Sequence, residues 1–320
     1  MIRTPEAPAG RAVPAAAPYR RSLWVRTRAL RTGLLFTSPW IVGILCFILY
    51  PTGASFYYSL TQYDLLQTPT FIGLDNYAQL LQDETVGIAI YNTLYYMVLW
   101  VPLNIALSIA VALLLNLKVR GMSIYRTLFY LPVLVPAVAT SLLWVWFLNP
   151  QYGVANWLLS LVGLPGLGWL ASTTWSKPSI VLISLWGSVG NTMLIFLASL
   201  QDIPRDLHDA AEVDGANAWQ RFWSITLPLL TPVIFFELII GIIAGIQFFT
   251  IPYVVTGGTG NPANSLTVFG LILYRAAFFN FKMGYASAMA WSATVIIFIL
   301  TYILFRTSNR WVFYQSGEAR

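Results

Sequence analysis

Acidic side chains gather in one internal stretch of the sequence, residues 201–232, which reads QDIPRDLHDAAEVDGANAWQRFWSITLPLLTP. Five of the 12 acidic residues of the chain lie there, and only Arg205 and Arg221 oppose them. The lone histidine, His208, has no cysteine or acidic partner at ligand spacing, so the stretch predicts no metal site. Its charge suits an electrostatic contact with a partner, although composition alone favours a solvated helical hairpin that only links two segments.

The sequence contains no phosphate-binding loop. The pattern G-x-x-x-x-G-K-[ST] does not occur, and the nearest glycine cluster, residues 257–262, lacks a lysine and predicts a turn-rich connector. If ATP drives this protein, another chain must bind it, and we predict no catalytic residue, metal or cofactor in this one. The net charge of +6 comes from basic residues at the ends of apolar segments and indicates no nucleic-acid partner.

Local chemistry predicts a first short helix in residues 201–232. Pro204 suits its first position because the missing N–H would be unpaired there in any case. Asp206 then complements the helix dipole, and Gly215 supplies the left-handed residue that ends the helix. One face carries, at three-and-four spacing, Leu207, Ala210 and Ala211. The two alanines would let another backbone approach closely.

A second short helix is predicted to follow. Asn217 and Gln220 have the spacing of a capping box, which marks its beginning. Leu227-Pro228 is expected to close it, because a residue before proline avoids the helical region.

Apolar segments dominate the rest of the chain, whose mean hydropathy is +0.68. Runs of about 18 or more apolar residues span a bilayer. We therefore predict an all-α polytopic membrane protein with six transmembrane helices, at residues 33–60, 88–115, 128–148, 180–200, 231–250 and 285–305. Pro102 in the second span and Pro132 and Pro136 in the third predict kinks. Residues 156–170 are apolar but short and broken by glycine and proline, and predict an interfacial segment.

The distribution of basic residues predicts that both termini are cytoplasmic. Residues 1–32 form a basic tail that we expect to be disordered, the six-span domain covers residues 33–310, and residues 311–320 form a second cytoplasmic tail. A cleaved signal peptide is the alternative for the N-terminus, but the apolar run is too long and lacks a small-residue cleavage site. With the N-terminus inside, 15 of the 18 Lys and Arg residues lie on the cytoplasmic side.

Polar and small residues on two of the spans predict a path for a polar solute. They share one face of each helix and are Ser184, Ser188 and Asn191 in the fourth span and Gly241, Gly245, Gln247 and Phe248 in the fifth. The alternative is that the small residues only allow tight helix packing.

Glu237 is the single acidic residue predicted within a span. Acidic residues inside a membrane are costly, which makes a functional role the default hypothesis. Glu237 follows Pro232 by only five residues, near the inner boundary. Two structural alternatives therefore stay open: the side chain snorkels to the boundary, or it is protonated.

Residues 209–228 resemble the EAA loop of the permease subunits of ABC importers, in which E-A-A, a glycine and I-x-L-P follow at fixed spacing. Asp209-Ala210-Ala211, Gly215 and Ile225-Thr226-Leu227-Pro228 stand at those positions. The stretch T-G-G at 256–258, Asn92-Thr93 and Gly284-Tyr285 are similar to the same family, in particular to its MalF-like sugar permeases.

This resemblance implies a permease subunit of a type I importer in a bacterial or archaeal plasma membrane. It implies a second, MalG-like permease subunit, two ATPase subunits that bind ATP and Mg, an extracytoplasmic solute-binding protein, and a sugar substrate, expected to be a di- or oligosaccharide. It also implies that the loop docks on an ATPase through Arg205, Leu207, His208, Asp209, Ala210, Ala211, Glu212, Asp214 and Gly215. The solute path named above lies where maltose-type permeases have their substrate pocket.

Two other classes are weighed against this one. An ion-coupled secondary transporter of small polar solutes is expected to have ionisable residues in its spans and two repeated halves, whereas this chain has one such acid and no obvious repeat. A membrane-embedded enzyme needs facing acids or a metal site near the membrane surface. The one acid cluster, residues 202–214, has no histidine partner except His208, so this hypothesis is weaker still.

Overall fold

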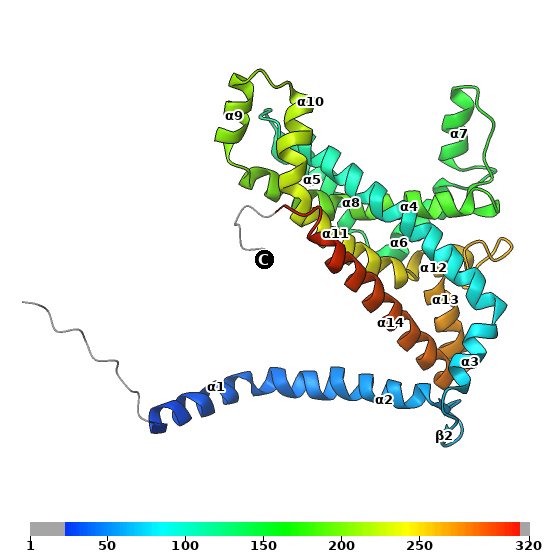
Figure 1. Cartoon of the computed structure of the whole chain (residues 1–320). Helices are drawn as coiled ribbons and strands as arrows, with labels where there is room; N and C mark the ends of the chain where they lie inside the picture. The colour runs from blue at the N-terminus through cyan, green and yellow to red at the C-terminus, as the bar shows by residue number, and fades with distance from the viewer. Residues whose placement is uncertain (1–22, 314–320) are drawn as a thin grey trace, which may run out of the picture. The chain divides into compact units, whose positions relative to one another are not determined.

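The computed structural model describes residues 23–313, which fall into two units, one ending at Ala54 and the other beginning at Ser55. Helices make up nearly all of both (Figure 1). Within the described range, β1 (Thr61–Gln62) and β2 (Thr70–Phe71) form one short antiparallel pair in which Thr61 lies opposite Phe71. Five helices are long and apolar enough to cross a membrane, or six if one bent pair counts as a single span. The predicted all-α membrane fold is thus confirmed.

The first unit is one helical run. α1 (Leu23–Ile44) passes through a π-helical turn, η1 (Leu45–Leu49), into α2 (Tyr50–Ser59), whose last residues belong to the second unit. Residues 31–59 form a candidate span of 29 residues, which matches the first predicted span. α1 begins at Leu23, inside the stretch predicted to be a disordered tail, because residues 23–32 contain neither glycine nor proline to stop a helix. The rest of that tail, residues 1–22, lies outside the described residues.

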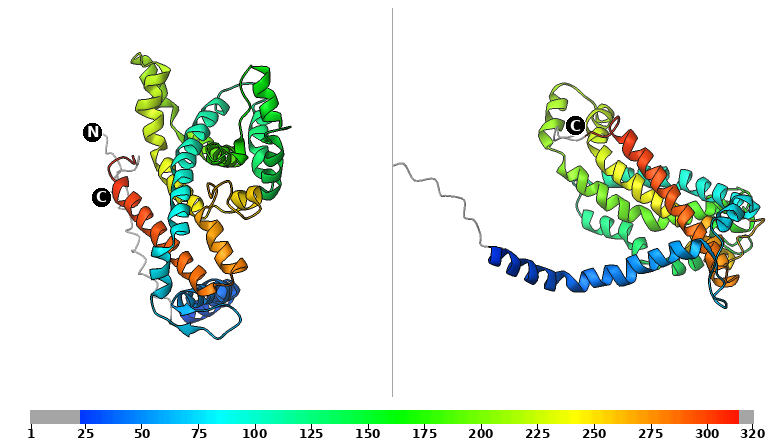
Figure 2. Two further views of the ribbon diagram at one scale, coloured as in Figure 1. Left: turned by 90° about the vertical axis from the view of Figure 1, so that its right-hand side faces the viewer. Right: turned by 60° about the horizontal axis from the view of Figure 1, so that its bottom comes forward.

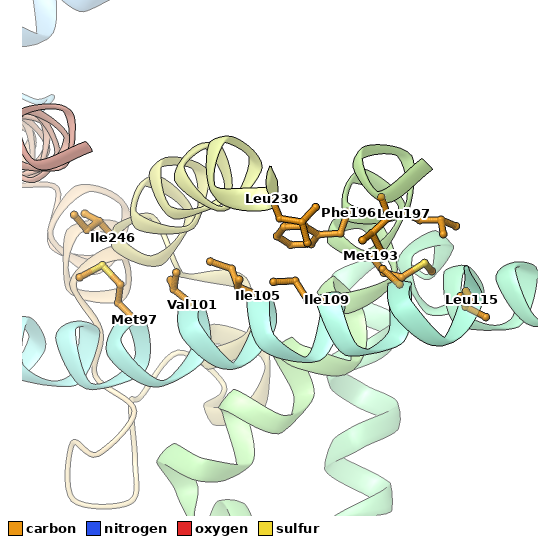
Figure 3. Packing of buried hydrophobic residues seen from close by; sticks show 12 residues of the cluster. Met97, Val101, Ile105, Ile109, Leu115, Met193, Phe196, Leu197, Leu230 and Ile246 are labelled. Atoms are coloured by element: carbon orange, nitrogen blue, oxygen red, sulfur yellow. The ribbon is translucent and has the colours of Figure 1, made fainter. Parts of the chain in front are cut away.

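Four long helices form the frame of the second unit. They are α4 (Glu84–Leu115), α8 (Ser176–Asp202), α11 (Leu227–Ile246) and α14 (Met283–Ser308). α4 packs against both α8 and α11, as Figure 3 shows for Val101, Ile105 and Ile109 opposite Phe196 and Leu230. All five side chains are at most 8% exposed. Pro102 lies within α4, which continues past it.

The third predicted span is not one helix. α5 (Met122–Tyr130) and the 3-10 turn η2 (Leu131–Leu134) are bent by 96° from α6 (Ala137–Phe147). Val135 between them is extended, with φ −80° and ψ 124°, as expected for a residue before a proline, here Pro136. The proline therefore breaks the span, where the sequence predicted only a kink.

The expected end of a helix at Leu227-Pro228 is wrong. α10 (Ala218–Arg221) runs through a π-helical turn, η4 (Phe222–Thr226), directly into α11. The Leu227 N–H donates to the Phe222 carbonyl five residues earlier, and Leu227 keeps helical angles although Pro228 follows. Proline falls within the first two positions of α11, where its missing N–H is tolerated. The fifth span therefore starts well before residue 231, its predicted beginning.

Shorter elements lie at the two ends of the second unit. α9 (Arg205–Val213) and α10 form a hairpin at one end, while α3 (Asp75–Gln82) and α13 (Phe269–Tyr274) lie at the other, as all views in Figures 1 and 2 show. The remaining elements are α7 (Val154–Leu161), η3 (Trp169–Ala171), α12 (Thr250–Thr256) and η5 (Arg275–Phe279). The segment 156–170 thus contains the rest of the short α7, a loop and the beginning of η3, and no seventh span.

The first residues of the predicted C-terminal tail lie against α11. The Phe313 N–H donates to Thr231 Oγ1 at 2.8 Å, and the rings of Trp311 and Phe235 have centroids 6.0 Å apart. Residues 314–320 lie outside the described residues.

Candidate functional site

The polar hairpin of residues 201–232 begins with α9. Pro204 lies at the N-cap position, directly before the first helical residue and one place earlier than predicted, and makes no side-chain capping bond. Asp206 lies in the first turn as expected, and Gly215 has φ +81°, the left-handed conformation that ends the helix. Local sequence thus dictates the beginning and the end of α9.

A capping box and an ion pair hold α10 in place. Asn217 Oδ1 accepts from the Gln220 N–H at 2.9 Å, and the Asn217 N–H donates to Gln220 Oε1 at 2.8 Å, which confirms the predicted box. Arg221 Nη1 donates to Glu212 Oε2 at 2.6 Å and so ties α10 to α9. Spacing along the chain did not predict this pair, because the turn between the helices brings the two residues together.

Most of α9 is exposed. Leu207 and Ala210 are exposed, whereas Ala211 and His208 are partly buried. His208 lines two neighbouring hollows, one with Trp219 and Phe222 and the other with Arg205 and residues 116–119. It is therefore less solvated than the sequence suggested. The described residues contain no group of His, Cys, Asp and Glu able to hold a metal ion.

Two cavities lie between the long helices. The first, which we call the polar cavity, has a volume of about 370 Å³ and is lined by residues of α4, α8 and α11 that include Asn104, Thr192 and Glu237. The second, the aromatic cavity, measures about 570 Å³ and is lined by Tyr96, Phe248 and residues 132–137, among others. Volumes of 300–1,000 Å³ are typical of small-molecule sites.

The predicted path residues divide between these cavities. Ser188, Asn191 and Gly241 line the polar cavity, and Ser184, Gln247 and Phe248 line the aromatic cavity. Asn191 and Gln247 are exposed and have no side-chain hydrogen bond within the described part of the chain. Their amide groups are therefore free to bind a solute.

Gly245 lines neither cavity and has a packing role. A Cβ there would lie 3.0 Å from Met97 Cγ on α4, and one at Gly241 would lie 2.9 Å from Val101 Cγ1. On α8, a Cβ at Gly190 would overlap the Phe129 carbonyl oxygen of α5. Small residues at these three positions let neighbouring helices approach closely.

Glu237 lies inside the helix bundle and does not snorkel. Its side chain is 6% exposed, and Oε2 accepts from Thr192 Oγ1 at 3.3 Å. Thr192 Oγ1 accepts from Asn104 Nδ2 at 3.1 Å, and Asn104 Oδ1 accepts from Ser188 Oγ at 2.8 Å. Ser188 Oγ in turn accepts from Trp100 Nε1 at 3.2 Å. One chain of hydrogen bonds therefore joins α4, α8 and α11.

Three aromatic rings stack beside this chain of hydrogen bonds. The ring of Tyr96 stacks on two others. Its centroid lies 3.7 Å from that of Phe248, with the two rings nearly parallel, and 5.5 Å from that of Trp100. Trp100 lines both cavities. Sequence reasoning missed Tyr96, Trp100 and Asn104, although their spacing of four residues places them on one face of the second span.

One motif that carries the family resemblance, Asn92-Thr93, bonds to the loop that follows another, the T-G-G stretch at 256–258. Asn92 Nδ2 donates to the carbonyls of Asn264 and Thr267, both at 2.8 Å. Thr93 Oγ1 accepts from the Phe269 N–H at 2.9 Å. These bonds fasten the loop after the T-G-G stretch to α4.

A bundle of membrane spans with internal cavities and a polar hairpin at one end is the architecture of a membrane transport subunit. The family described as "Binding-protein-dependent transport system inner membrane component" matches residues 104–314. The chain belongs to this family and is a permease subunit of an ABC importer, located in the inner membrane with several spans. It is not itself an enzyme, and partner ATPase subunits bind the ATP.

Individual relatives agree with the family. The probable ABC transporter permease protein YesP of Bacillus subtilis (strain 168) is 42% identical over 300 residues, which cover 92% of this chain and 96% of that protein. The trehalose/maltose transport system permease protein MalF of Thermococcus litoralis is 32% identical and covers 87% of this chain and 95% of its own length. A solved bacterial alginate ABC transporter, in complex with a periplasmic protein that binds an alginate pentasaccharide, matches with a TM-score of 0.79 at 26% identity, over 90% of this chain and 97% of that one.

Proposed function

We propose that this permease subunit lines the path of a sugar, of two or more units, between α8 and α11. The observation that carries the proposal is that six of the seven predicted path residues line the two neighbouring cavities. Hydroxyl and amide groups suit the hydroxyls of a sugar, and aromatic rings suit its apolar faces. Among the relatives, the T. litoralis protein is a trehalose/maltose permease and the alginate transporter complex holds a pentasaccharide, which supports an oligosaccharide.

We also propose that α9 docks on an ATPase subunit. The support is its surface, on which the exposed Asp206, Asp209 and Ala210 lie beside the partly buried Ala211. Both termini and this hairpin would face the cytoplasm, in keeping with the basic residues near them. ATP-driven movement of the ATPases would then shift α9 and alternate the access of the cavities to the two sides.

The complete assembly would contain a second permease subunit, two ATPase subunits and an extracytoplasmic solute-binding protein. The solute-binding protein delivers the sugar to the outer mouth. Coupling requires that each partner binds the two conformations of the permease with different affinity.

The test compares Gln247→Leu with Gln82→Leu in the complete importer, reconstituted in vesicles with ATP inside and a panel of radiolabelled di- to pentasaccharides outside. Gln247 lines the aromatic cavity, whereas Gln82 is exposed at the end of α3 and lines neither cavity described above. We expect the wild type and Gln82→Leu to accumulate sugar. Gln247→Leu should lose uptake but keep its melting temperature and the stimulation of ATP hydrolysis by loaded binding protein.

Two results would contradict the proposal. If the wild type accumulates no member of the panel in an ATP-dependent manner, the sugar assignment is wrong. If Gln247→Leu loses uptake, thermal stability and stimulation together, the residue supports packing and the path lies elsewhere.

A further inference from the structure

Glu237 is the one acidic side chain among the residues that line the two cavities. Neither lining contains a lysine, an arginine or a histidine. Glu237 comes from α11, one helical turn before the path residue Gly241, and both line the polar cavity. Any solute group that enters this cavity therefore meets a carboxyl group and no positive charge.

Only one oxygen of the Glu237 carboxyl group is hydrogen-bonded to the described residues of the protein. Oε2 accepts a hydrogen bond from Thr192, but Oε1 has no hydrogen-bond partner within the described residues. Oε1 is also absent from the fully enclosed atoms that lack a partner. Because Oε1 is neither fully enclosed nor bonded to the protein, it can accept a hydrogen bond from a group that enters the polar cavity.

The neighbouring side chains hold the carboxyl in place and add no compensating charge. Asn104 and Thr192 are each about 5% exposed or less, and each is committed to the chain of hydrogen bonds from Trp100 to Glu237. Asn191 is the neighbour with a free amide. Together, Oε1 and this amide can pair with sugar hydroxyls, which both donate and accept hydrogen bonds.

We propose that Glu237 is a specificity-determining residue that makes the polar cavity a subsite for uncharged, hydroxyl-rich groups and excludes carboxylated sugars. A carboxylate moved out of water needs a cation or several donors to compensate its lost hydration. The polar cavity offers it no cation and places another carboxyl group, that of Glu237, beside it. The proposal rests on the proposed path between α8 and α11. It sets this chain apart from its structural relative, an importer of the acidic polysaccharide alginate.

The test measures equilibrium binding to the membrane complex of both permease subunits and the two ATPase subunits in lipid nanodiscs, without the solute-binding protein, so that only the selection by this complex is seen. The probes are radiolabelled maltotriose, which is neutral, and radiolabelled trigalacturonate, which carries three carboxylates. We expect wild-type importer to bind maltotriose at least about tenfold more tightly. Glu237→Gln keeps the size of the side chain and the Thr192 bond, and should raise the affinity for trigalacturonate about tenfold while changing that for maltotriose less than about twofold.

Three further variants complete the test. Glu84→Gln makes the same change at the exposed beginning of α4, outside both cavities, and should leave both affinities unchanged. Thr192→Val removes the hydrogen bond but keeps the carboxyl, and should keep the preference for maltotriose. Glu237→Leu replaces Glu237→Gln if the latter fails to assemble with the ATPases, and should likewise raise the affinity for trigalacturonate.

The inference is overturned by any of three results: wild type that does not bind maltotriose, wild type that binds trigalacturonate as tightly, or an unchanged ratio of affinities after removal of the carboxyl. ATP-dependent uptake by the wild type is measured separately, as described above. An importer that accumulates sugar but shows no effect of Glu237 on the ratio would retain the proposed function and refute only this inference.

Discussion

Arg221 and Glu212 form an ion pair of 2.6 Å that joins the two helices of the polar hairpin. Arg221 is 27% exposed and Glu212 is 71% exposed, so water screens the pair, and such pairs typically contribute about 0.2–1 kcal/mol. Among the described residues it is nevertheless the one side-chain hydrogen bond that links α9 to α10, so it helps to hold the two helices together.

Replacing Arg221 by alanine should loosen α9. We expect amide hydrogens of residues 205–213 to exchange up to about fivefold faster, in line with the free energy of an exposed ion pair. Arg205→Ala, at the start of the same helix and without an ion pair in the described structure, serves as the control. Equal exchange rates in wild type and Arg221→Ala would show that the pair does not hold the hairpin together.

Ala211→Trp should block assembly with the ATPase subunit. The proposed docking face has small side chains at Ala210 and Ala211, and an indole there would hold the partner's backbone away. Val213→Trp is the matched control, since Val213 is 89% exposed and lies two residues further, on the other side of the helix. Co-purification of the ATPase at the wild-type yield with Ala211→Trp would contradict the proposed docking face.

The salt dependence of assembly should depend on Asp206 and Asp209 more than on Glu212. Glu212 is already paired with Arg221, whereas neither aspartate has an ion pair within the described residues. Asp206→Asn combined with Asp209→Asn should weaken ATPase binding about twofold to tenfold at low salt and make it less sensitive to added salt. If both the affinity and its salt dependence stay as in the wild type, these acids take no part in docking.

Gly190→Ala should destabilise the bundle, and Gly187→Ala should not. A Cβ at Gly190 would overlap the Phe129 carbonyl oxygen and lie 3.1 Å from Tyr130 Cα, and neither backbone atom can move easily. At Gly187, on the same helix, a Cβ would meet no atom within 4 Å. Overpacking typically costs about 1–3 kcal/mol. The melting temperature of the purified complex should therefore fall for Gly190→Ala and stay unchanged for Gly187→Ala. Equal melting temperatures of the two variants would contradict the close approach of α5 and α8.

The sequence alone predicted the features that depend on local chemistry. Length and hydropathy identify the spans, and the capping pattern of Asn217 and Gln220 identifies the beginning of α10. The predictions at proline were wrong in opposite directions, because Pro136 breaks a span and Pro228 does not end a helix. The difference comes from the π-helical turn before Pro228, which no pattern in the sequence announces.

The part of the site contributed by α4 was not predicted. Ser188 was identified from its own helix, but its partners Trp100 and Asn104 lie more than 80 residues away along the chain. The position of Glu237 was misjudged for a related reason. Its distance from Pro232 suggested the membrane boundary, whereas the helix actually begins at Ala218 and places Glu237 well inside the bundle.

The absence of a break at Pro228 has a mechanical consequence. Residues 218–256 form a candidate span of 39 residues in which α10 leads into α11, so the hairpin and the wall of the polar cavity belong to one rod. At 1.5 Å per residue, about 35 Å of helix separate Ala218 from Gly241. A push on α10 would therefore reach Glu237 and Gly241 along continuous helix, and the places where that helix could bend are the π-helical turn of residues 222–226 and Pro232.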